Sequence, residues 1–167
     1  MGHLHVITQL IEKKIVDHLL VVPAGEPLLR GEGPKASAQQ RRAMCQLALS
    51  DLPADVANKV QVNPIEVLRT GPSYAIDTVE AVAQNYPDDS IVLIVGQDAA
   101  DKLDQWHRFD ELRTMVEFVV ISRPGYEGNG IDIGALPVAA TTIREGLSAD
   151  VSSSVATFIR ENNLYDN

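Results

Sequence analysis

Apolar side chains recur along the chain in two different rhythms, and each rhythm predicts a kind of element. Short, nearly continuous runs rich in β-branched residues occur at positions 19–22, 60–67, 91–95 and 118–121, with a weaker run near 131–133. Strands that are buried on both faces have this pattern, and such strands occur mainly in parallel sheets. The runs therefore predict the strands of a parallel sheet.

Between these runs, apolar residues return every three or four positions, as they do on one face of a helix. There are four such stripes: Leu4, Ile7, Ile11 and Ile15; Met44, Leu47 and Ala48; Ile76, Val79 and Val82; and Val151, Val155, Phe158 and Ile159. Residues 37–40, Ser-Ala-Gln-Gln, precede the second stripe and have the form of a capping box. Strands that alternate with helices predict an α/β fold with helices on both faces of a parallel sheet.

One feature of this order is irregular, because the chain opens with a helical stripe and no strand run precedes it. In doubly wound folds the first strand usually lies centrally, next to the ligand crevice. Without that strand, its neighbours would keep unpaired backbone groups, and each such group costs about 1–3 kcal/mol where water is excluded. A few of these groups would consume much of the total stability of a domain, which is about 5–15 kcal/mol. We therefore expect a coding start assigned too late, and a chain that is poorly stable and nearly inactive as written. The upstream reading frame tests this hypothesis.

The composition narrows the class of protein. Hydrophobic residues make up 45% of the 167 residues and charged residues 22%, which is typical of one globular domain and excludes a disordered chain. The net charge of −9 argues against a nucleic-acid-binding surface, although a local basic pocket for one nucleotide is compatible with it. No apolar run approaches the roughly 20 residues that span a bilayer, and no signal peptide is evident. A cytoplasmic protein without a membrane partner is expected.

The single cysteine, Cys45, excludes an intrachain disulfide. Its neighbours suit the packed face of a helix, so we interpret it as a small buried apolar residue rather than as a catalytic thiol.

Several polar residues stand where ligand chemistry is plausible. His3 falls in the first turn of a predicted helix, where unpaired N–H groups and the positive end of the helix dipole favour phosphate. Gly96 and Asp98 end a buried strand, where glycine admits a ligand and a carboxylate can accept hydrogen bonds from ribose. The ordinary alternatives are a surface histidine and an aspartate that caps a helix.

Two further segments have the same ambiguity. Residues Thr141-Thr-Ile-Arg144 open a predicted helix, where hydroxyls, amides and an arginine could hold a triphosphate. The alternative is a threonine cap followed by a solvated arginine. Trp106 can stack on a ring, although a lone tryptophan is more often part of a core.

Taken in order, these segments resemble those of the bacterial nicotinate mononucleotide adenylyltransferases, and the resemblance runs nearly end to end. The matching segments are Gly2-His3-Leu4, Val21-Val-Pro-Ala-Gly-Glu-Pro27, Arg41 ahead of Met44, Gly71-Pro-Ser-Tyr-Ala-Ile-Asp-Thr78, Ile94-Val-Gly-Gln-Asp98, Trp106-His-Arg-Phe109, Phe118-Val-Val-Ile-Ser-Arg-Pro-Gly125, Thr141-Thr-Ile-Arg144 and Phe158-Ile-Arg-Glu-Asn-Asn-Leu-Tyr165. The resemblance implies a Rossmann-like, doubly wound parallel sheet of the His-x-Gly-His nucleotidyltransferase type. On this interpretation residues 1–167 are a single domain that lacks the family's first strand and phosphate loop.

The resemblance also implies an activity: adenylyl transfer from ATP, with Mg2+, to nicotinate mononucleotide, giving deamido-NAD and pyrophosphate in NAD biosynthesis. The resemblance also implies a role for individual residues. Gly2, His3, Gly96, Asp98, Thr141 and Arg144 would bind ATP, with His3 as the catalytic residue, whereas Arg30, Thr78 and Trp106 would bind the mononucleotide. Two alternatives stay open: a non-catalytic remnant that binds nucleotide, and an adenylyltransferase for another mononucleotide acceptor. The oligomeric state, including a homo-oligomer, is also left open.

Overall fold

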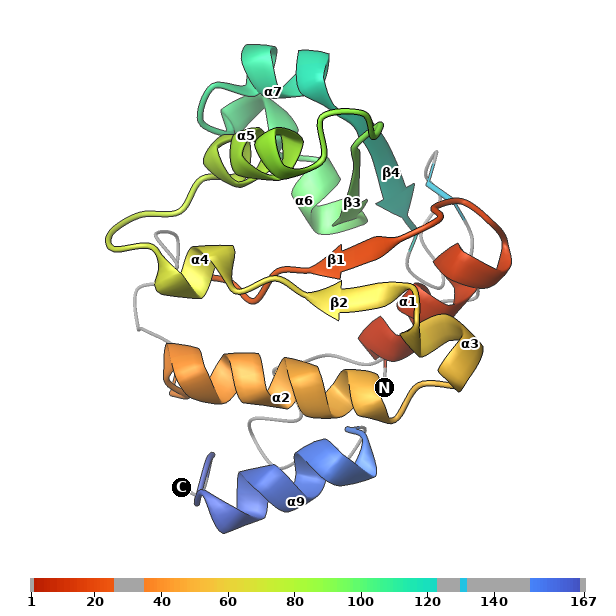
Figure 1. Cartoon of the computed structure of the whole chain (residues 1–167). Helices are drawn as coiled ribbons and strands as arrows, with labels where there is room; N and C mark the ends of the chain where they lie inside the picture. The colour runs from red at the N-terminus through yellow and green to blue at the C-terminus, as the bar shows by residue number, and fades with distance from the viewer. Residues whose placement is uncertain (1, 26–34, 123–129, 132–150, 166–167) are drawn as a thin grey trace.

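The computed structural model describes residues 2–25, 35–122, 130–131 and 151–165, and Figure 1 shows their arrangement. Strand β1 (Leu19–Val21) pairs in parallel with β2 (Val60–Val62), and β3 (Val92–Gly96) pairs in parallel with β4 (Glu117–Ile121). The predicted α/β class with parallel strands is confirmed. Among the described residues the strands form two separate pairs, because no ladder joins β1 to β3.

The four predicted helical stripes correspond to the four longest helices of the described residues. These are α1 (Gly2–Glu12), α2 (Ala38–Ser50), α5 (Ala75–Asn85) and α9 (Ser153–Glu161). The capping box before α2 is confirmed, since the Ser37 hydroxyl accepts from the Gln40 N–H and the Gln40 side chain accepts from the Ser37 N–H. Shorter helices connect the others: α3 (Ala54–Ala57), α4 (Ile65–Leu68), α6 (Gln97–Ala100), η1 (Leu103–Gln105) and α7 (Phe109–Met115).

The apolar run at 60–67 is not one strand, so this prediction was wrong in its second half. Strand β2 stops at Val62, and α4 begins three residues later. The Asn63 side chain accepts a hydrogen bond from the Ile65 N–H at 3.1 Å, and Pro64 has no N–H to continue a ladder. Because the residues of α4 are also mostly apolar, hydrophobicity alone does not reveal the break.

Two other predicted elements differ slightly from those in the structure. Helix α1 ends before Ile15, because Lys14 adopts a left-handed conformation with φ 54°. The weak run near 131–133 is represented by an isolated parallel bridge between Ile121 and Ile131, and positions 132–133 lie outside the described residues.

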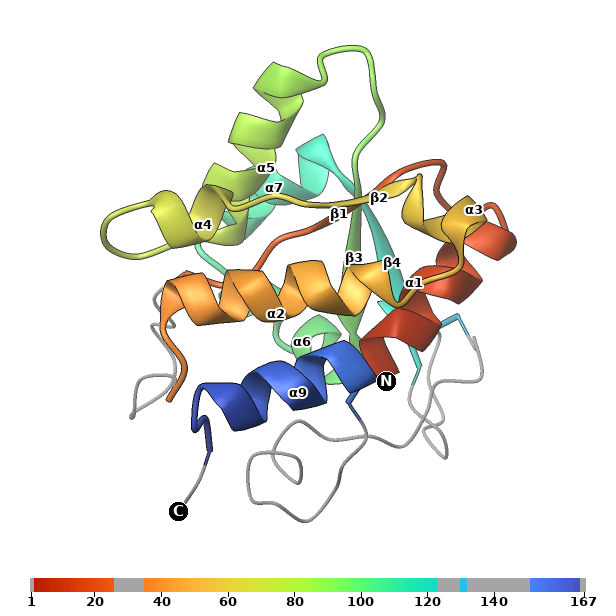
Figure 2. The same cartoon turned by 60° about the horizontal axis from the view of Figure 1, so that its bottom comes forward.

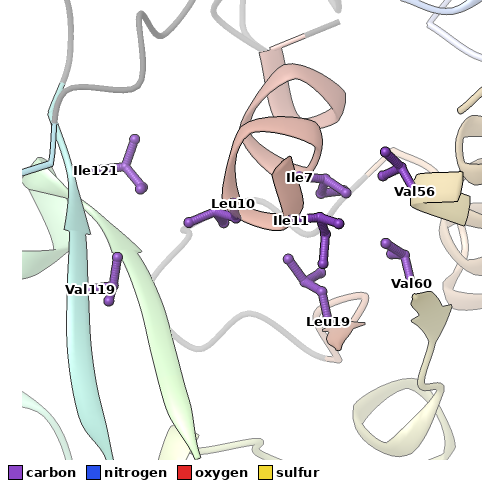
Figure 3. Packing of buried hydrophobic residues seen from close by; sticks show 8 residues of the cluster. All are labelled: Ile7, Leu10, Ile11, Leu19, Val56, Val60, Val119 and Ile121. Carbon is purple, nitrogen blue, oxygen red and sulfur yellow. The ribbon is translucent and has the colours of Figure 1, made fainter. Parts of the chain in front are cut away.

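Helix α1 holds the two strand pairs together (Figure 3). Its buried residues Ile7, Leu10 and Ile11 belong to one cluster with side chains from both pairs and from α3. On the β1–β2 side these are Leu19, Val56 and Val60, and on the β4 side they are Val119 and Ile121. The N-terminal helix is therefore the central packing element of the described structure.

The remaining helices cover the outer sides. Helices α5 and α7 pack together beside β3 and β4 around Ile76, Val79 and Leu112. Helix α2 lies against β2, and α9 lies alongside α2 in both views (Figures 1 and 2). The described helices include none with the length and apolar character needed to cross a bilayer.

Candidate functional site

Gly2 and His3 occupy the first turn of α1, as predicted. No acidic residue lies in that turn, so no carboxylate there offsets the positive end of the helix dipole. The His3 side chain is exposed. This placement fits an imidazole that meets phosphate at a helix start.

Gly96 and Asp98 lie at the carboxyl end of β3, also as predicted. Gly96 is the last residue of the strand and the N-cap of α6, and a Cβ built on it meets no described atom within 4 Å. Packing against the described residues therefore does not require a glycine here. Asp98 is the second residue of α6, so the alternative interpretation of Asp98 as the N-cap is wrong.

Two of the sequence motifs meet at the start of α5. The ring of Tyr74, from the Gly-Pro-Ser-Tyr motif, lies against the ring of His107, from Trp-His-Arg, with a centroid separation of 4.2 Å. Arg108 adds a link to α5, because its Nη2 lies 2.8 Å from Glu80 Oε1. It also lies 2.5 Å from Glu111 Oε2, and hydrogen bonds from Arg108 hold the pKa of that carboxyl below its ordinary value.

Trp106 is half-buried and packs against the apolar cluster beneath α5 and α7. This packing confirms the interpretation that Trp106 is part of a core, as a lone tryptophan usually is. Trp106 would contact the nicotinate end of a ligand through the part of its side chain that stays exposed.

Thr78 is nearly buried and is held by charged partners. Its hydroxyl donates to Glu66 Oε1 at 2.9 Å, and Arg69 Nη1 approaches the same hydroxyl oxygen at 3.4 Å. The hydroxyl hydrogen is thus committed to Glu66, so the side chain can offer a ligand only an acceptor.

Gly25, which follows β1, is the point where several elements meet. Its N–H donates to Glu66 Oε2 at 3.2 Å, and its carbonyl oxygen accepts from Arg41 Nη2 at 2.9 Å. A Cβ built on Gly25 would lie 2.7 Å from the Glu66 carbonyl oxygen and 2.9 Å from Ser73 Oγ. Only glycine fits this close approach.

Comparisons with known proteins show the family to which the chain belongs. Residues 1–159 match the cytidylyltransferase-like family model. A probable nicotinate-nucleotide adenylyltransferase of Oceanobacillus iheyensis is 31% identical, over 99% of this chain and 90% of the relative. The chain belongs to the nicotinate-nucleotide adenylyltransferase family.

Other members of the nicotinate-nucleotide adenylyltransferase family match over similar lengths. The enzyme of Bacillus subtilis is 27% identical over 99% of this chain and 91% of the relative. A solved Plasmodium falciparum nicotinic acid mononucleotide adenylyltransferase, complexed with NaAD, has a TM-score of 0.82 at 14% identity and covers 99% of this chain and 90% of its own. At that identity the likeness shows the fold alone, and it confirms the predicted Rossmann-like class.

Three of the predicted site residues of this family member, Arg30, Thr141 and Arg144, lie outside the described residues. The expected meeting of His3, Asp98 and Arg144 in one hollow therefore stays a prediction. In the described part of the chain, no group of three His, Cys, Asp or Glu side chains is placed to hold a metal ion.

The sequence pattern alone indicates no role for the side chains of Glu66, Arg69, Tyr74 and His107. For Glu66 a signal existed, because it is the one carboxylate in the otherwise mostly apolar run at 60–67. A buried strand would not tolerate such a charge, and this indicates that the run changes structure. The ring contact between Tyr74 and His107 joins residues 33 positions apart, which no local pattern encodes.

Cys45 provides a simple test of the packing of α2. Burial raises the pKa of its thiol, and the charge of Arg41 only partly opposes this. Because the raised pKa keeps the thiol protonated, we expect alkylation by iodoacetamide at pH 8 to be about tenfold slower in the native protein than in guanidinium. Mass spectrometry over time measures both rates. Equal rates would contradict a packed, protonated Cys45.

Proposed function

We propose that this protein transfers the adenylyl group of ATP to nicotinate mononucleotide, releasing pyrophosphate and deamido-NAD. The observation that carries the proposal is the contact between Tyr74 and His107. It places the Gly-Pro-Ser-Tyr motif against the Trp-His-Arg motif, two of the segments that carry the resemblance to the family. The sequence identity to family members over 99% of the chain supports the same activity.

The reaction needs no covalent intermediate with the protein. The phosphate of the mononucleotide attacks the α-phosphate of ATP in line, and the bond to pyrophosphate breaks. The protein contributes alignment and the neutralisation of growing charge. Mg2+ would enter as part of the MgATP substrate, because Mg2+ is usually held by substrate phosphates and one or two carboxylates.

The proposed roles divide the site into two sides. On the ATP side, His3 at the head of α1 would meet phosphate, Gly96 and Asp98 would meet the ribose, and Thr141 and Arg144 would hold the distal phosphates. On the acceptor side, Thr78 and Trp106 would bound the nicotinate ring, and Arg30 would meet the substrate phosphate. A cytoplasmic location belongs to the same proposal.

The test incubates the purified chain with MgATP and either nicotinate or nicotinamide mononucleotide. We expect slow but measurable pyrophosphate release and a deamido-NAD mass with the acid, at a higher kcat/KM than with the amide. Higher kcat/KM with the amide would instead indicate another acceptor. Binding of ATP by calorimetry without turnover would overturn the proposal in favour of a non-catalytic nucleotide-binding protein.

A further inference from the structure

We propose that Arg41 and Glu66 are positioning residues for the mononucleotide acceptor, an inference that rests on the function proposed above. Both side chains act on Gly25, from opposite sides of its backbone, and Glu66 also holds Thr78. Neither residue needs to touch the substrate. Together they fix the backbone that follows β1 relative to the start of α5.

Arg41 ties together two stretches that are separate in the sequence. Its Nη2 donates to the carbonyl oxygens of Ala24 and Gly25, at 2.7 and 2.9 Å, while its Nη1 donates to the carbonyl oxygen of Ala36 at 2.8 Å. A planar guanidinium offers these donors in a fixed fork, which suits several acceptors at once. The capping box explains where Arg41 stands, because it fixes the first turn of α2 and the Arg41 N–H bonds to the Ser37 carbonyl oxygen.

Glu66 completes the arrangement from the other side. One carboxylate oxygen accepts from the Gly25 N–H and the other from the Thr78 hydroxyl. The turn at Asn63 starts α4 and so places Glu66 between these two donors. The peptide groups on both sides of Gly25 are therefore fixed by charged side chains, and hydrogen bonds to charged groups are among the stronger ones in proteins.

This arrangement concerns the acceptor side rather than the ATP side. Thr78, which is bonded directly to Glu66, is predicted to bound the nicotinate ring. Those predicted ATP-binding residues that the structure describes lie instead on α1 and at the junction of β3 and α6. Loosening Gly25 should therefore weaken acceptor binding selectively.

The first test replaces Arg41 by lysine, which keeps the charge but cannot reach all three carbonyl oxygens with one ammonium group. We expect R41K to raise the KM for nicotinate mononucleotide about tenfold, the size of one lost charge-assisted hydrogen bond. The KM for ATP should stay within about twofold of the parent value. The matched control is R42K, the neighbouring arginine in the same helix, which should change neither constant. Equal acceptor KM values for R41K and R42K would overturn the proposal.

The second test uses Glu66→Gln, whose amide nitrogen cannot accept a hydrogen bond from either Gly25 or Thr78. We expect a rise in acceptor KM again, with E161Q on the exposed face of α9 as control. Because both residues act through Gly25, the double variant R41K/E66Q should show less than the product of the two single effects. Fully independent effects would contradict action through one shared backbone group.

Amide hydrogen exchange separates failure of this inference from failure of the proposed function. R41K and E66Q should each speed exchange of the Gly25 N–H, which is bonded to Glu66, relative to R42K, whether or not the chain turns over substrate. Faster exchange without any parent activity would refute the proposed function, and with it the acceptor role. Unchanged exchange in both variants would refute the link through Gly25 itself.

Discussion

Replacing Leu10 with alanine is expected to lower the free energy of unfolding by about 2–5 kcal/mol. Leu10 is fully buried in α1, in the cluster that reaches both strand pairs. Removing its side chain leaves a cavity between the two parallel pairs, which in the described part of the chain are joined by packing rather than by a ladder. For a domain with about 5–15 kcal/mol of total stability, this is a large fraction. Chemical denaturation followed by circular dichroism measures the change.

The chain contains a matched control for this substitution. Leu68, at the end of α4, is 70% exposed, so L68A removes the same atoms without opening a cavity. Its effect should stay within about 0.5 kcal/mol. Similar losses for L10A and L68A would show that α1 is not the packing element that the structure indicates.

The second large effect is expected for Gly25→Ala. The new methyl group would lie 2.7 Å from the Glu66 carbonyl oxygen, and backbone cannot rotate away as a side chain can. The chain after β1 must shift, at a cost of about 1–3 kcal/mol for overpacking. The same shift would lengthen the hydrogen bonds from Arg41 and to Glu66, so we also expect a higher KM for nicotinate mononucleotide. Denaturation and steady-state kinetics check the two effects.

Gly96→Ala is the control for the folding effect alone. A Cβ at Gly96 meets no described atom within 4 Å, and the residue has an ordinary extended φ of −77°. We expect no loss of stability, and a small gain is typical at such positions. A stability loss at Gly96 equal to that at Gly25 would mean that close packing is not the reason for glycine at position 25.

The sequence alone was sufficient for the elements with strong periodicity. The buried runs predicted β1, β3 and β4, and the stripes predicted α1, α2, α5 and α9, because burial on one or both faces leaves a regular apolar pattern. The capping box formed by Ser37 and Gln40 could also be predicted, since it involves residues only three positions apart. The family could be recognised because its motifs occur in a fixed order.

Only the tertiary structure decided which residues far apart in the sequence are in contact. The apolar run at 60–67 concealed a turn and a short helix, because hydrophobicity does not distinguish a buried strand from a half-buried helix of four residues. The bonds from Gly25 to Arg41 and Glu66 span 16 and 41 positions. Periodicity describes which face of one element is buried, whereas such contacts depend on how several elements pack together. The sequence thus determined the fold class and family, and the packing determined how the residues around Gly25 are held.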